Sequence, residues 1–153
     1  MFKILRNILV PDAPGDEGGD RFDPLLTAVA VLLAEIAQAD HEHADVEAEE
    51  IRSQLMANFS LSETEAIELA KAARATATES VSLHEFTRTL HDSMDYKEKE
   101  AVVEMLWRIA LADRNLDKYE DYMIGKIAEL LYVYRQDVLR IKHNVVESIR
   151  TKT

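Results

Sequence analysis

The chain has no cysteine and little glycine or proline. The lack of cysteine excludes disulfide bonds, thiolate metal sites and cysteine nucleophiles. Glycine occurs 4 times and proline 3 times in 153 residues, and most of both lie within residues 11–20. A glycine-rich phosphate loop and a Gly-x-Ser-x-Gly elbow are therefore excluded.

Positive charge is also scarce. The chain has 18 Lys and Arg against 29 Asp and Glu, for a formal net charge of -11, and the basic residues form no patch in the sequence. Nucleic acids and anionic membrane surfaces are therefore excluded as expected partners, and divalent cations or basic protein surfaces are expected. We expect a cytoplasmic protein, because residues 1–10 are too short for a signal segment and contain Arg6 and Asn7.

The composition and the hydrophobic spacing predict an all-α fold. The chain is 47% hydrophobic and 31% charged, which is typical of a soluble, helix-rich domain. Asp23 and Pro24 predict the start of a long helix that ends near Asp40. Four capping boxes predict further helix starts, at Ser62–Glu65, Ser82–Glu85, Asp95–Glu98 and Asp117–Glu120. With helices near residues 45–58 and 136–149, the expectation is about seven helices and no strand.

The chain divides into three parts. Residues 1–10 have apolar residues at helical spacing and predict a short amphipathic helix, and residues 11–22 read as a flexible Pro/Gly/Asp linker. Residues 23–153 form the main helical domain. The short helix could dock on this domain, bind a partner or associate weakly with a membrane; membrane association is not expected elsewhere.

The most informative pattern is an internal repeat. Seven residues of one segment recur 73 positions later, namely Ala28, Val29, Leu33, Ile36, Ala37, Ala39 and Asp40 as Ala101, Val102, Leu106, Ile109, Ala110, Ala112 and Asp113. The register continues, so Glu47 matches Glu120. This pattern predicts an internally duplicated bundle in which the two copies pack about a pseudo-twofold axis.

Each copy carries an Asp at the end of one helix and a Glu in the first turn of the next. If the two loops lie close together, Asp40, Glu47, Asp113 and Glu120 form one oxygen-rich site for Ca²⁺, Mg²⁺ or Mn²⁺. His41 could add a nitrogen ligand for Zn²⁺ or Ni²⁺. The same acids could instead only cap helices, because carboxylates near a helix N-terminus favour the macrodipole and accept backbone amides.

Standard metal motifs do not fit these loops. Asp113, Asn115 and Asp117 resemble the start of an EF-hand, but Lys118 stands where Gly is needed and Ile124 where a bidentate Glu is needed.

Zinc-protease and di-iron motifs are also excluded. His41 and His84 are each followed by Glu, but Asp45 and Arg88 stand where a zinc-protease helix needs its second His. No His follows a Glu by three positions, so a paired di-iron bundle site is not expected.

The segment from Met105 to Ile124, with Leu106-Trp107, Ala112-Asp113, Leu116-Asp117 and Glu120, resembles the bacterial tellurite-resistance TerB-like family. The resemblance covers roughly residues 25–145 and is looser in the first copy. It implies an all-helical, duplicated, acidic domain proposed to sense or bind metal ions in a stress response. The glycine usual after the Asp is His41 in one copy and Arg114 in the other. Metal-binding residues implied by the family carry over only to Asp40, Glu47, Asp113, Asp117 and Glu120.

The resulting hypothesis is a non-enzymatic TerB-like domain that binds a divalent cation weakly at the paired acidic loops and contributes to tellurite or metal stress response. The alternative is an acidic helical adaptor that docks a basic protein without a metal. The sequence points to no catalytic residue, and the identity of the metal stays open.

Overall fold

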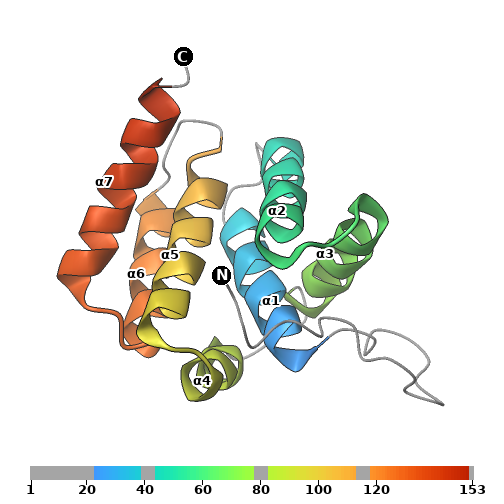
Figure 1. The fold of residues 1–153 in the computed structure, drawn as a ribbon, viewed down its shortest axis with the longest axis horizontal. Helices are drawn as coiled ribbons and strands as arrows, with labels where there is room; N and C mark the ends of the chain where they lie inside the picture. The colour runs from blue at the N-terminus through green and yellow to red at the C-terminus, as the bar shows by residue number, and fades with distance from the viewer. Residues whose placement is uncertain (1–22, 39–43, 78–82, 113–117, 152–153) are drawn as a thin grey trace.

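The computed structural model describes residues 23–38, 44–77, 83–112 and 118–151, in which it forms α-helices and no strand. Figure 1 shows the helices arranged as two groups on either side of a central pair, α1 and α5. The helices are α1 (Pro24–Gln38), α2 (Ala44–Phe59), α3 (Glu63–Ala77), α4 (Leu83–Ser93), α5 (Tyr96–Ala110), α6 (Lys118–Leu130) and α7 (Arg135–Thr151). The all-α prediction and its helix number are confirmed, with boundaries within two residues of those expected.

Capping side chains set several helix starts. Asp23 accepts a hydrogen bond from the amide of Leu25 at 2.7 Å, which places Pro24 in the first turn of α1 as predicted. The box of Ser62 and Glu65 is closed by reciprocal bonds of 3.1 and 2.9 Å, and that of Asp95 and Glu98 by bonds of 2.8 and 3.0 Å. The predicted boxes at Ser82 and Asp117 lie outside the described residues.

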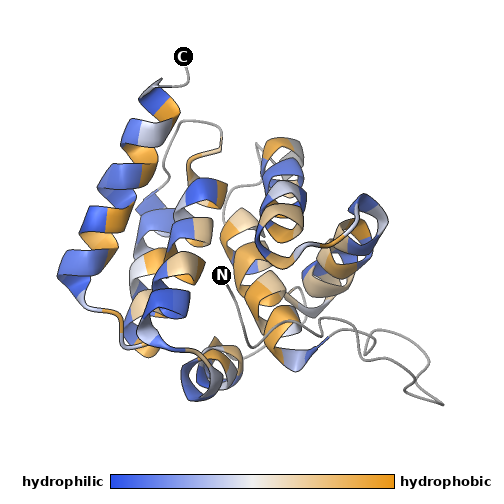
Figure 2. Cartoon of the chain, viewed as in Figure 1, coloured by the Kyte–Doolittle hydropathy of each residue, from blue (hydrophilic) through white to orange (hydrophobic). Residues whose placement is uncertain are grey.

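The central helix α1 is apolar on almost every face. Its sequence contains one charged residue, Glu35, and its side chains from Leu25 to Ala34 are buried apart from Thr27. A helix that is apolar all round must be covered on all sides. The surrounding helices α2, α3, α4 and α5 cover it, and Figure 2 shows its hydrophobic surface at the centre of the fold.

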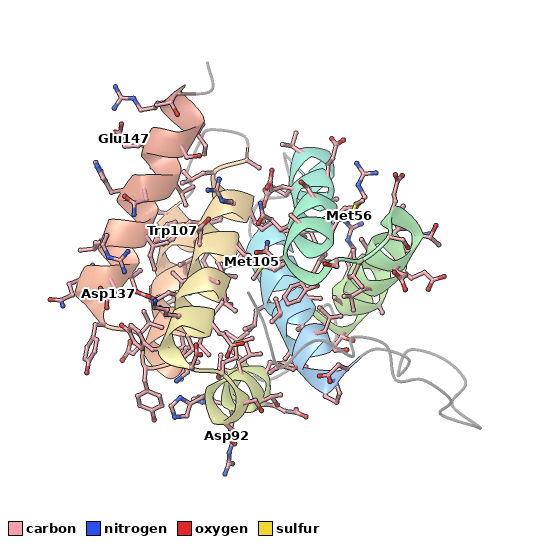
Figure 3. The ribbon with its side chains drawn as sticks, viewed as in Figure 1. Met56, Asp92, Met105, Trp107, Asp137 and Glu147 are labelled. Carbon is pink, nitrogen blue, oxygen red and sulfur yellow. The ribbon has the colours of Figure 1, made fainter. Side chains whose placement is uncertain are left out.

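Trp107 fills the space on the other side of α5. Its side chain is 2% exposed, and Figure 3 shows it between α5 and α7, whereas Met105 points toward α1. The Nζ atom of Lys142 on α7 lies 5.0 Å from the centre of the Trp107 ring, a distance suited to a cation–π interaction. Trp107 is therefore part of the hydrophobic core.

Apart from those of α4, which packs on α1 and α6, the helix contacts follow a symmetric pattern. α1 packs on α2 and α3, α5 packs on α6 and α7, and α1 and α5 pack on each other; in addition α2 contacts α5 and α6 contacts α1. Two copies related by a twofold axis would contact each other in this way. The buried Leu33, Ile36, Leu106 and Ile109 lie on the central pair. The internal duplication stays a prediction, which this pattern supports.

The turn after α6 explains why the β-like run Tyr132-Val133-Tyr134 forms no strand. Val133 donates a hydrogen bond to the carbonyl of Ala128 at 2.9 Å and Tyr132 donates to that of Glu129 at 3.0 Å, a Schellman arrangement. It requires a left-handed residue, and Tyr132 takes this role with φ 62°. The run is therefore part of a turn between α6 and α7. Ser60, the first residue after α2, also has a positive φ, of 54°.

Tyr96 connects the start of α5 to the start of α7. Its hydroxyl donates to Asp137 at 2.6 Å and accepts from the amide of Tyr134 at 3.0 Å. Arg140 forms ion pairs with Glu100 and with Asp137 beside it. The bonds of Tyr96 and the Arg140–Glu100 pair join residues about forty positions apart and orient α7 along α5.

The predicted parts of the chain outside the domain are not described. The short helix at residues 1–10 and the linker at residues 11–22 lie outside the described residues, so the division into three parts stays a prediction. None of the helices described is both long enough and apolar enough to cross a lipid bilayer.

Candidate functional site

Two carboxylates of the predicted site are buried at matching positions. Glu47 lies in the first turn of α2 with 1% of its surface exposed, and Glu120 lies in the first turn of α6 with none exposed. Burial of a charged group costs several kcal/mol unless it is compensated. The helix N-termini supply part of that compensation, and both side chains have interaction partners. The structure therefore holds two inward-facing acids that the fold must accommodate.

The acidic residues of the run 47–50 do not share one environment. Glu49 is exposed and Glu50 is partly exposed, whereas Glu47 faces the core. The reason is the helical turn of about 100° per residue, which puts Glu47 on the same side of α2 as the buried Ile51.

The helices that lead into the two loops run in the same direction. In Figure 1 α1 and α5 both rise from the lower edge, so their C-terminal ends lie at the same end of the molecule. The other predicted ligands, Asp40, His41, Asp113 and Asp117, lie outside the described residues. Within the described residues, no group of three or more His, Asp or Glu side chains has the geometry to hold a metal ion. The metal site stays a prediction.

Glu35 is an acidic residue near this end of the molecule that belongs to none of the sequence motifs described above. It lies in the last turn of α1 and is partly buried. Burial raises the pKa of the Glu35 carboxyl above its ordinary value of 4.5, because the charged form loses solvation. A signal was present in the sequence, since Glu35 is the single charge in an otherwise apolar helix.

Glu35→Gln is expected to stabilise the domain at neutral pH. A carboxyl with a raised folded-state pKa stabilises the fold at pH below 4.5, and this contribution is lost as pH rises through the folded-state pKa. The variant should therefore unfold at higher urea concentration than wild type at about pH 7, with the difference shrinking toward about pH 4. Glu129→Gln, at an exposed position, is the control. An equal effect of the two substitutions would contradict the prediction.

A polar groove of about 490 Å³ opens between α2, the end of α5 and α7. Its lining includes Glu50, Gln54, Arg108, Ala112 and Ile149. Gln54 donates to Glu50 at 2.6 Å. The groove offers both hydrogen-bond donors and acceptors beside the end of α5, where the second loop begins.

A buried lysine lies at the opposite end of α5. Lys99 is largely buried and its Nζ contacts Nδ1 of His91, whose ring packs at a tilt of 46° against that of Tyr132, with centroids 4.6 Å apart. Burial lowers the pKa of the Lys99 amine, and the nearby Asp92 partly offsets this effect.

Comparison with known proteins identifies the family. The family model described as Tellurite resistance protein TerB matches residues 26–143, which covers α1 to α6 and part of α7. No curated protein and no solved structure matches the chain significantly. The match spans well over half of the chain and includes both buried glutamates, so this chain belongs to the tellurite-resistance TerB family.

Proposed function

We propose that this TerB domain is a non-enzymatic module that binds a divalent cation weakly at its two acidic loops and takes part in a tellurite or metal stress response. The single observation that carries the proposal is the burial of Glu47 and Glu120 in equivalent first turns. A fold stabilised by apolar packing alone gains nothing from two buried acids. Acids beside loops that carry Asp40, His41, Asp113 and Asp117 would give hard cations the oxygen ligands they prefer.

The arrangement of the helices supports the same proposal. α1 and α5 pack on each other and point the same way, so the ends from which the loops depart are at one end of the molecule. The net charge of -11 attracts cations to the surface in general. If the two acidic loops face each other, their carboxylates would bind the cation directly, in addition to the long-range attraction of the negative net charge.

The test is a thermal-shift series with Ca²⁺, Mg²⁺, Mn²⁺, Zn²⁺ and Ni²⁺ on wild type and on the Asp40→Asn/Asp113→Asn double variant. A cation present at 100 times its Kd stabilises the folded state by about 2.7 kcal/mol. For a domain of this size, that raises the Tm by roughly 5–10 °C. We expect one ion to raise the Tm of wild type and to lose most of this effect in the double variant.

The matched control is Glu49→Gln/Glu129→Gln, which removes two exposed carboxylates and so makes the same change in net charge. It should keep the full ion response. If both double variants lose the response equally, the ions act on the overall charge and no loop site exists. If no ion shifts wild type, cation binding is wrong.

The second candidate is an adaptor that docks a basic protein without metal. The observation in its favour is the number of exposed aromatic side chains on α6 and in the turn that follows it, since tyrosine is enriched in protein interfaces. These are Tyr119, Tyr122, Tyr132 and Tyr134, each more than half exposed. If no ion raises the Tm of wild type, the adaptor becomes the better supported hypothesis.

A further inference from the structure

An open groove between α2 and α3 differs in charge from the rest of this acidic protein. Its volume is about 380 Å³, and its lining consists of Ala48, Glu49, Arg52, Ile67, Ala70, Lys71 and Arg74. Three cationic groups therefore face one carboxylate. The whole chain has a net charge of -11, whereas the side chains that line this groove have a positive net charge. It suits a ligand that carries negative charge.

The floor of the groove is apolar and exposed. Ile67 on α3 is 37% exposed and lines the groove together with the small apolar residues Ala48 and Ala70. Apolar side chains that line a concave surface offer a contact for an apolar part of a ligand. The groove therefore suits an occupant that is both apolar and acidic.

The cations of the groove differ in how they are held. Arg52 forms ion pairs with Glu49 at 3.2 Å and with Glu63 at 3.3 Å, so its position is set by neighbours on both helices. Lys71 makes no ion pair in the part of the chain that the structure describes. Lys71 can therefore take a new carboxylate partner without losing an existing one.

The N-terminal segment of the same chain has the complementary chemistry. Residues 11–20 contain four acids and no Lys or Arg. Residues 1–10 carry Phe2, Leu5 and Leu9 at the i, i+3 and i+7 positions that a helix uses to enter a groove. The segment therefore joins an apolar helical face to an acidic run.

The segment is also tethered within reach. It joins the domain at Asp23, at the start of α1, and α1 packs on both α2 and α3. The twelve residues 11–22 can span at most about 40 Å when extended, whereas α3 is only about 22 Å long. A short tether gives an effective concentration in the millimolar range, so even a weak contact within the chain is favoured over one with a second copy.

We propose that residues 1–20 dock in the α2–α3 groove of their own chain, with the apolar face of residues 1–10 on Ile67 and Ala70 and the acids of residues 11–20 toward Lys71 and Arg74. The groove is then an intramolecular docking site, and release of the segment exposes it. This proposal is independent of the cation site, because none of the six predicted ligands lines the groove.

The absence of cysteine makes the test direct, since introduced thiols have no competitors. In the full chain, Leu5→Cys is combined with Ile67→Cys in the groove or, as control, with Leu139→Cys. Leu139 is 49% exposed on α7, which Figure 1 places on the opposite side of the molecule from α3. Both partner positions are exposed, so both variants should fold, and helix content by circular dichroism verifies this.

At micromolar protein and with a mild oxidant, the Leu5→Cys/Ile67→Cys variant is expected to form a disulfide within the monomer at least about tenfold faster than the control pair. Adding Lys71→Glu/Arg74→Glu should slow its formation several-fold, and Asp12→Lys/Asp16→Lys in the same chain should restore it. High salt should also slow it, because exposed charges are screened beyond about 10 Å at 0.1 M.

Equal rates for the two cysteine pairs would overturn the proposal, because a docked segment must bring residue 5 to the groove more often than to α7. A faster rate at Ile67 that Lys71→Glu/Arg74→Glu leaves unchanged would reflect the position of the tether alone and would also overturn it. A disulfide that links two chains at the groove would assign the segment to a second copy and would also overturn it. Binding of the wild-type chain to vesicles of anionic lipid, together with equal rates, would assign residues 1–10 to a membrane surface instead.

Discussion

Trp107→Ala is expected to cost about 3–5 kcal/mol of unfolding free energy, because truncation of a buried Trp removes a large apolar surface and leaves a cavity. The side chain is 2% exposed between α5 and α7 and also holds Lys142 over its ring. At roughly 2–4 °C per kcal/mol, the Tm should fall by about 6–20 °C. Urea unfolding followed by circular dichroism measures the change directly.

Two comparisons test the reason for this loss. The Nε1 atom of Trp107 has no hydrogen-bond acceptor among the described residues, so Trp107→Phe removes volume without breaking such a bond and should cost clearly less than Ala. Tyr122→Ala removes an aromatic side chain that is 61% exposed and should change stability by less than about 0.5 kcal/mol. Similar losses for Trp107→Ala and Tyr122→Ala would refute the assigned role in the core.

Glu120→Ala is expected to cost about 3 kcal/mol, because it removes a fully buried carboxylate and leaves the groups around it without their partner. Glu47→Ala should have an effect of similar size, since Glu47 takes the equivalent place in α2. Urea unfolding in the presence of a chelator separates this structural effect from any contribution of a bound ion.

The control for this pair is Glu129→Ala, an exposed glutamate on the same helix as Glu120, which should change stability by less than about 0.5 kcal/mol. If Glu120→Ala lowers the free energy of unfolding no more than the control does, the buried carboxylate does not stabilise the fold. A loss in chelator that grows further when the effective cation is added would show that Glu120 also serves the ion.

The positions of the helices followed well from local patterns. Asp23 with Pro24, and the boxes at Ser62 and Asp95, start helices where the sequence placed them, since a cap needs only atoms within three residues. The apolar repeat likewise identified Leu33 and Leu106 as core residues, and both are fully buried. These features depend on short-range hydrogen bonding and on helical periodicity.

Local sequence patterns predicted less about the candidate site. Glu47 and Glu120 were selected for their spacing, but their burial was not foreseen, and Glu35 was missed altogether. Whether an acid faces solvent depends on which helices cover it. A local pattern has no information on that arrangement until α1, α2, α5 and α6 are packed together.

The amino-acid sequence by itself determined the helical class, the capped helix starts, the two matched acidic loops and the family to which the chain belongs. Only the tertiary structure decided which acids lose solvent, that Tyr96 bonds to Asp137 across 41 positions, and that α2 and α3 enclose a cationic groove. The physical reason is that capping and periodicity act within a few residues of each other. Burial, local pKa and groove shape arise between segments that only folding brings together.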